Sequence, residues 1–150
     1  MTKNIFALVL YGLTATTGWA GMPPIQKLQE LPTTWTGVAG DLFTKSSAAL
    51  VINKIHSEIR EVGTEGFSAL YDVSAELHFG ARVLAIRKIE LSGSEMSKNV
   101  LWLNFELQDE LVSRLYAAIT YDEASKIYFL KEMPRQNGER RFFFSAKTVP

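Results

Sequence analysis

The 150-residue sequence contains no cysteine, two histidines and no excess of either charge, with 16 basic and 16 acidic side chains. Without cysteine the chain is neither a disulfide-stabilised scaffold nor a lipoprotein anchored through a lipidated cysteine. A balanced charge gives no long-range attraction for phosphate, which argues against a general nucleic-acid-binding protein. Hydrophobic residues make up 47% of the chain, a composition typical of a globular domain rather than of a disordered one.

The first twenty residues have the order of a secretory signal peptide. Lys3 precedes an apolar run from Ile5 to Leu13, and small residues follow up to Ala20. A basic start, a short apolar centre and small residues at the cleavage point are typical of such signals. The run is shorter than the ~20 residues that a membrane helix needs. We expect cleavage after Ala20, export to the periplasm or the medium, and a single mature domain over residues 21–150 with a net charge of −1.

After Pro32 the hydrophobic pattern has a period of two, which is typical of strands with one buried face. Residues 67–79 alternate most regularly. Short segments rich in turn-forming residues separate the predicted strands, which cover residues 33–43, 50–62, 67–79, 82–91, 100–108, 111–121, 126–133 and 139–148. Before them, residues 23–31 predict a short helix, because Pro24 suits a first helical position and Pro32 ends it.

The short connections predict that consecutive strands pair antiparallel, in an up-and-down meander. Eight long strands in this order close most naturally into a barrel, whose interior is filled by side chains or by one small ligand. We therefore predict an all-β fold, an eight-stranded closed or nearly closed barrel with a short N-terminal helix. A β-sandwich or open sheet is one alternative. An outer-membrane barrel is another, although the sequence has no clear aromatic girdles and does not end in an aromatic residue.

The residues Thr34-Trp35-Thr36-Gly37 open the first strand, directly after the short helix. Together with the strand count, they resemble the calycin superfamily, which includes lipocalins and avidins. Lipocalins carry a tryptophan at this place, packed under the barrel floor against an arginine from near the last strand. The resemblance implies that role for Trp35 with Arg140 or Arg141. The glycine that normally lies two residues before the tryptophan is Thr33 here, and no family ligand-site motif is present.

Two sets of residues are candidates for binding. The strand alternation places one set inside the barrel, as a site for a small apolar ligand: Tyr71, Val73, Leu103, Phe105 and Ile119. The C-terminal strands are apolar on both faces although a barrel buries only one, which predicts that the N-terminal helix, a protein partner or a second copy of the chain covers the outer face. The outward residues for this contact are Trp102, Tyr116, Tyr128 and Phe143. A three-residue loop at 108–110 would place Trp102 opposite Tyr116.

Residues suited to catalysis or metal binding are few. A three-residue loop at 63–65 would place His56 opposite Asp72, either as a proton-transfer pair or, more simply, as a solvated cross-strand pair. Asp72, Glu76 and His78 share one strand face, but neither a helical histidine pair nor a calcium loop accompanies them. The sequence contains no nucleophile elbow, phosphate loop or dinucleotide motif. We expect no catalytic residue, no metal site and no cofactor.

The sequence thus favours an exported, non-enzymatic binding protein with a small apolar ligand in the barrel or a protein partner on an aromatic outer face. An enzyme of the isomerase or cyclase type is an alternative, and it would need polar groups that converge inside the barrel. A periplasmic inhibitor or immunity protein is another, acting through loops such as Gly63–Gly66 or Ser92–Lys98. We expect no nucleic-acid partner and no stable membrane insertion.

Overall fold

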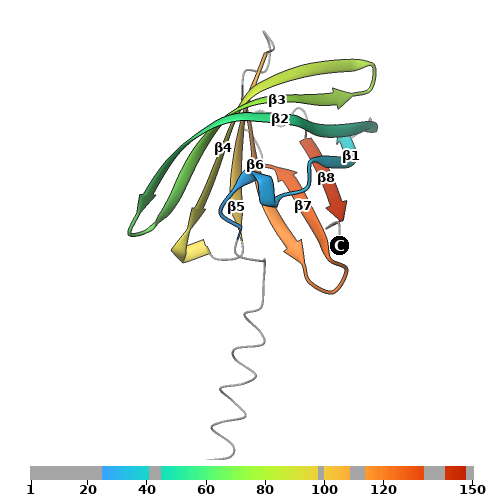
Figure 1. Ribbon diagram of the computed structural model, residues 1–150. Coiled ribbons are helices and arrows are strands. Elements are labelled where there is room, and N and C mark those ends of the chain that lie inside the picture. The colour runs from blue at the N-terminus through green and yellow to red at the C-terminus, as the bar shows by residue number, and fades with distance from the viewer. Residues whose placement is uncertain (1–24, 41–44, 98–99, 109–113, 134–140, 148–150) are drawn as a thin grey trace, which may run out of the picture.

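The structure is a computed structural model that describes residues 25–40, 45–97, 100–108, 114–133 and 141–147. Eight antiparallel strands follow one another in chain order, and β1 also pairs with β8, so that the sheet closes into a barrel (Figure 1). This confirms the all-β meander and the closed barrel, and it excludes the sandwich and the open sheet. The expected signal peptide and its cleavage after Ala20 lie outside the described residues.

The strands differ greatly in length, and the longest three are consecutive. Their bounds are β1 (Thr34–Gly40), β2 (Lys45–Gly63), β3 (Gly66–Phe79), β4 (Arg82–Ser94), β5 (Leu101–Leu107), β6 (Arg114–Asp122), β7 (Ile127–Glu132) and β8 (Arg141–Lys147). Two single 3-10 turns complete the described elements, η1 (Leu28–Glu30) before β1 and η2 (Glu95–Ser97) after β4. None of the helical segments in the described ranges is long and apolar enough to cross a membrane.

The helix expected over residues 23–31 is, in its described part, only the turn η1. The Glu30 carboxylate accepts hydrogen bonds from the backbone N–H groups of Gln26 at 2.8 Å and Lys27 at 3.3 Å. These N–H groups are therefore capped by a side chain, and Pro32 follows too soon for the helix to lengthen. Ile25, Leu28 and Leu31 are nevertheless buried. Residues 25–31, which we call the N-terminal segment, thus pack against the barrel.

Two β-bulges shape β2. The pairing of β2 with β3 shifts between Ile52 and Lys54, and again between Ile55 and Ser57. Bulges bend a strand and increase its twist. The end of the β2–β3 hairpin reaches the same end of the molecule as η2 (Figure 1). The backbone N–H of Glu95 donates to the carbonyl of Glu65 at 2.9 Å, which joins the hairpin turn to η2.

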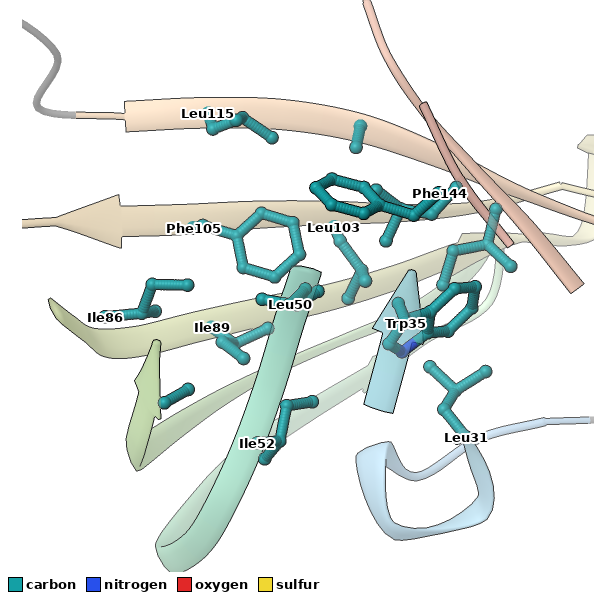
Figure 2. Close-up of a cluster of buried hydrophobic side chains, with 14 of the residues drawn as sticks. Leu31, Trp35, Leu50, Ile52, Ile86, Ile89, Leu103, Phe105, Leu115 and Phe144 are labelled. Carbon is teal, nitrogen blue, oxygen red and sulfur yellow. The ribbon is translucent and has the colours of Figure 1, made fainter. Parts of the chain in front are cut away.

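The barrel interior is a continuous hydrophobic core. In Figure 2, Leu50 of β2, Ile89 of β4 and Phe105 of β5 point toward one another from different strands. Trp35 lies buried near Leu31, and its Nε1 donates to the carbonyl of Pro32 at 2.8 Å. Barrel closure and this packing stabilise a chain that contains no cysteine and therefore no disulfide.

The backbone register pairs Arg141 with Gly40, at the opposite end of β1 from Trp35, so strand pairing does not place Arg141 and Trp35 opposite each other. The ring of Tyr128 lies beside Trp35 instead, with 6.2 Å between ring centroids. Arg140 lies outside the described residues.

Candidate functional site

The five residues expected to hold an internal ligand all lie inside the barrel. Tyr71, Val73, Leu103, Phe105 and Ile119 are each 5% exposed or less. A cavity lined in part by Phe105 has a volume of about 10 Å³, which is about the smallest space that holds one water molecule. The interior beside Phe105 is therefore packed by the protein's own side chains, and all five residues belong to one hydrophobic core.

A much larger hollow, about 250 Å³, opens where the β2–β3 hairpin, η2 and the N-terminal segment meet. We call it the mouth pocket. Its apolar walls are Ile25, Val62, Phe67, Val100 and Leu101, and the other lining residues are Gln26, Arg60, Gly63, Gly66, Gly93, Ser94, Glu95 and Ser97.

Two glycines allow β3 and β4 to approach closely at the edge of this pocket. Gly66 has a φ of +151°, and a Cβ at this position would lie 2.1 Å from the carbonyl oxygen of Gly93. A Cβ on Gly93 would in turn lie 2.8 Å from the ring of Phe67. Side chains at either position would clash with the pocket wall, so glycine is needed for its shape.

Arg60 is held in the pocket wall by several contacts. Its Nε donates to a carboxylate oxygen of Glu58 at 2.7 Å, and its Nη2 donates to the carbonyl of Gln26 and, at 3.4 Å, to the hydroxyl of Tyr71. The guanidinium also lies 5.1 Å from the ring centroid of Phe67, within cation–π range. The hydrogen bond to Glu58 raises the pKa of Arg60, which keeps this side chain charged.

The mouth pocket brings together residues that lie far apart in the sequence. The loops Gly63–Gly66 and Ser92–Lys98, considered for an inhibitor, contribute residues to it, and its residue Arg60 donates to Tyr71 from the expected ligand set. Val62 was missed because a regular period places Ile55 and Ile59 on one face of β2. The bulge between Ile55 and Ser57 shifts the alternation by one residue, so that Ile59 is exposed and Val62 lines the pocket.

The expected pairing of His56 with Asp72 is wrong because the hairpin turn is one residue shorter than expected. The turn has two residues rather than three, and the unbroken register from Gly63 and Gly66 pairs Asp72 with Ser57. The hydroxyl of Ser57 donates to Asp72 at 2.9 Å, while Nε2 of His56 lies 2.7 Å from the hydroxyl oxygen of Ser74. His56 and Asp72 each therefore have a serine side chain as partner on the exposed hairpin.

The strand face that carries Asp72, Glu76 and His78 does not gather these side chains into one site. Nε2 of His78 lies 2.9 Å from a carboxylate oxygen of Glu76, whereas Asp72 interacts with Ser57. Within the ranges that the structure describes, no three metal-binding side chains form a cluster.

The outward aromatic residues Trp102 and Tyr116 do come together, although the expected register is wrong. Trp102 pairs with Ala118, and Tyr116 pairs with Asn104, because the β5–β6 connection is longer than three residues. The two aromatic rings are diagonal neighbours and stack, with centroids 5.5 Å apart and planes within 7°. Tyr116 is 47% exposed, so this pair is an accessible surface feature.

Phe143 also points outward, but it belongs to a separate aromatic pair. Its ring stacks on that of Phe129 with 5.7 Å between centroids, and it is 43% exposed. Phe143 lies in the same row across the sheet as Trp102, but Ala118 and Lys131 lie between them. The expected outward aromatic residues therefore form one pair on β5 and β6, while Phe143 forms another with Phe129 on β7 and β8.

Tyr128 was expected to point outward, and this is wrong. Its side chain is buried, and its ring lies 4.7 Å from that of Tyr121, measured between centroids. Burial raises the pKa of its hydroxyl, with smaller contributions from Tyr121 and Glu30. Residues 127–130 are all apolar, so the sequence pattern does not show which alternate residues of β7 face inward.

Glu132 lies on the inward face of β7, and the sequence pattern did not predict that this acidic residue is buried. It is 3% exposed, and its carboxylate accepts a hydrogen bond from the backbone N–H of Phe142 at 3.1 Å. Among the described residues it is the one charged side chain in the buried class. This hydrogen bond joins the end of β7 to β8.

No protein-family model, curated protein sequence or solved structure matches this chain.

Proposed function

We propose that this chain is an exported, non-enzymatic binding protein of calycin-like architecture, which holds a small apolar ligand in the mouth pocket. The signal-like N-terminus, the barrel meander and the position of Trp35 support the export and the resemblance. The observation that carries the proposed site is the contrast between about 10 Å³ inside the barrel and about 250 Å³ at its mouth. An engineered apolar cavity of about 150 Å³ binds benzene, so the mouth pocket has room for a somewhat larger ring compound.

The pocket walls indicate the chemistry of the ligand. Val62, Phe67 and Leu101 provide apolar surface, whose burial stabilises a complex by about 25 cal/mol per Å². The charge of Arg60 is already paired with Glu58, so its N–H groups favour a neutral hydrogen-bond acceptor over an anion. The ligand class is therefore apolar, uncharged and small, with at most a few polar atoms.

Binding can be tested with N-phenyl-1-naphthylamine, a neutral aromatic dye whose fluorescence rises in apolar surroundings. The mature chain should bind the dye with a saturable increase in fluorescence. Val62→Trp adds bulk at a pocket-lining position that is 74% exposed, so it should weaken binding by about tenfold or more without disturbing the core. The control is Ile59→Trp, because Ile59 lies on the same strand, is 67% exposed and does not line the pocket.

The proposal fails if the mature chain does not bind the dye, or if Val62→Trp binds it as tightly as the wild type. Equal losses in Val62→Trp and Ile59→Trp would also contradict it, because they would show an effect of the whole hairpin. Thermal unfolding of both variants checks that each is folded at the temperature of the titration.

A further inference from the structure

A second hollow lies on the outside of the barrel, over strands β3 to β6, and has a volume of about 220 Å³. We call it the outer groove. Five of its six lining side chains are polar or charged, which distinguishes it from the mouth pocket and from an apolar interface. The lining residues are Leu70, Lys88, Glu90, Asn104, Glu106 and Arg114.

The strand register brings these polar groups together. Lys88, Glu106 and Arg114 lie directly opposite one another on β4, β5 and β6, so that positive and negative charges alternate across the sheet. In the neighbouring row, Glu90 pairs with Asn104. The Cβ atoms of directly opposed residues lie about 5 Å apart. The floor of the groove therefore has hydrogen-bond donors and acceptors in close alternation.

The stacked rings of Trp102 and Tyr116 border the groove. Tyr116 lies directly opposite Asn104, and Trp102 is the next outward residue on β5. Their near-parallel planes and the partial exposure of Tyr116 give an aromatic edge beside the polar floor. An apolar aromatic surface and a polar floor are therefore available to one ligand.

We propose that the outer groove binds a neutral saccharide. A sugar ring has an apolar C–H face that packs on an aromatic ring, and hydroxyl groups that both donate and accept hydrogen bonds. Two carboxylates and two cationic side chains line the groove, so an ionised ligand of either sign meets repulsion as well as attraction. A protein partner is less well matched, because the centre of a protein interface is depleted of charged residues.

The test is to titrate the mature chain separately with cellobiose, maltose and N,N′-diacetylchitobiose. NMR amide chemical shifts monitor the binding of each sugar. At least one of these sugars should bind with a millimolar dissociation constant and shift Trp102, Asn104 and Tyr116. The double variant Trp102→Ala/Tyr116→Ala should lose these shifts. Phe143→Ala is the matched control, because it removes a similarly exposed aromatic ring from the separate pair on β7 and β8.

A second variant keeps the test valid if the aromatic double variant does not fold. Glu106→Ala removes one exposed carboxylate from the floor and should weaken sugar binding several-fold. The proposal is overturned if none of the three sugars causes shifts, or if the shifts lie outside the groove. It is also overturned if the wild type sediments as a dimer that Trp102→Ala converts to a monomer, because the surface would then bind a second copy.

Discussion

The hydroxyl of Tyr71 accepts a hydrogen bond from the backbone N–H of Leu28 at 3.2 Å, in a buried position. This bond joins the N-terminal segment to β3, although the two residues lie far apart in the chain. Ile25 and Gln26, in the same segment, line the mouth pocket. The bond therefore connects the packing of the barrel to the shape of the proposed ligand site.

Tyr71→Phe should reduce both stability and ligand binding. The substitution keeps the buried ring but removes the acceptor for Leu28, and a buried N–H that loses its partner costs about 1–3 kcal/mol. Urea unfolding measures the stability and the dye titration measures the binding. Tyr116→Phe, on the outer surface, is the control and should change neither. Unchanged stability in Tyr71→Phe would show that the bond to Leu28 contributes little.

Gly37→Ala should weaken the closure of the barrel. A Cβ on Gly37 would lie 1.9 Å from the carbonyl oxygen of Phe143, so the backbones of β1 and β8 would have to separate. Such overpacking costs about 1–3 kcal/mol or more, measured as a loss of unfolding free energy. Gly63→Ala is the control, because the nearest atom there is 3.9 Å away. Equal stability of the two variants would contradict this view of closure.

Phe105→Ala should be among the most destabilising single substitutions in the chain. Phe105 is 2% exposed at the centre of the interior, and truncation of such a residue costs about 3–5 kcal/mol. Phe143→Ala, on the outer surface, should cost far less in the same denaturant experiment. A loss below about 1 kcal/mol for Phe105→Ala would show that the interior is not packed as described.

Tyr128 should make the folded state sensitive to alkaline pH. Burial raises the pKa of its hydroxyl above the ordinary value of 10.0, so the folded state favours the protonated form. The stability from this preference is complete below pH 10 and is lost as pH rises through the raised pKa. Unfolding free energies of wild type and Tyr128→Phe, measured from pH 8 to pH 11, should diverge only above about pH 10. A constant difference across this range would contradict the prediction.

The barrel itself could be predicted from the sequence, because regular alternation in residues 67–79 and short turns leave few ways to pair the strands. The interior positions of Tyr71, Phe105 and Ile119 followed from the same alternation. The predicted direction of a side chain was wrong where the hydrophobic pattern does not show which alternate residues face inward, as in β7. There Tyr128 and Phe129 are both apolar, and only tertiary packing determines that Tyr128 faces inward.

The mouth pocket could not be predicted from the sequence. Its residues come from the N-terminal segment, the β2–β3 hairpin and the β4–β5 connection, and no local pattern relates them. The bulge between Ile55 and Ser57 places Ile59 on the opposite face of β2 from Ile55, and the sequence gives no clear signal for its position. The sequence predicts that Trp102 lies opposite Tyr116, whereas the two rings stack through a diagonal contact in a different register.

The central claim is that the ligand binds at the barrel mouth and not in its interior. The most direct test is an NMR titration of the protein with N-phenyl-1-naphthylamine, comparing the amide shifts at the mouth pocket with those in the barrel interior. We predict saturable shifts at Gly63, Gly66 and Gly93, with small changes at Leu103 and Ile119. Large shifts at Leu103 and Ile119 without shifts at the three glycines would contradict the account.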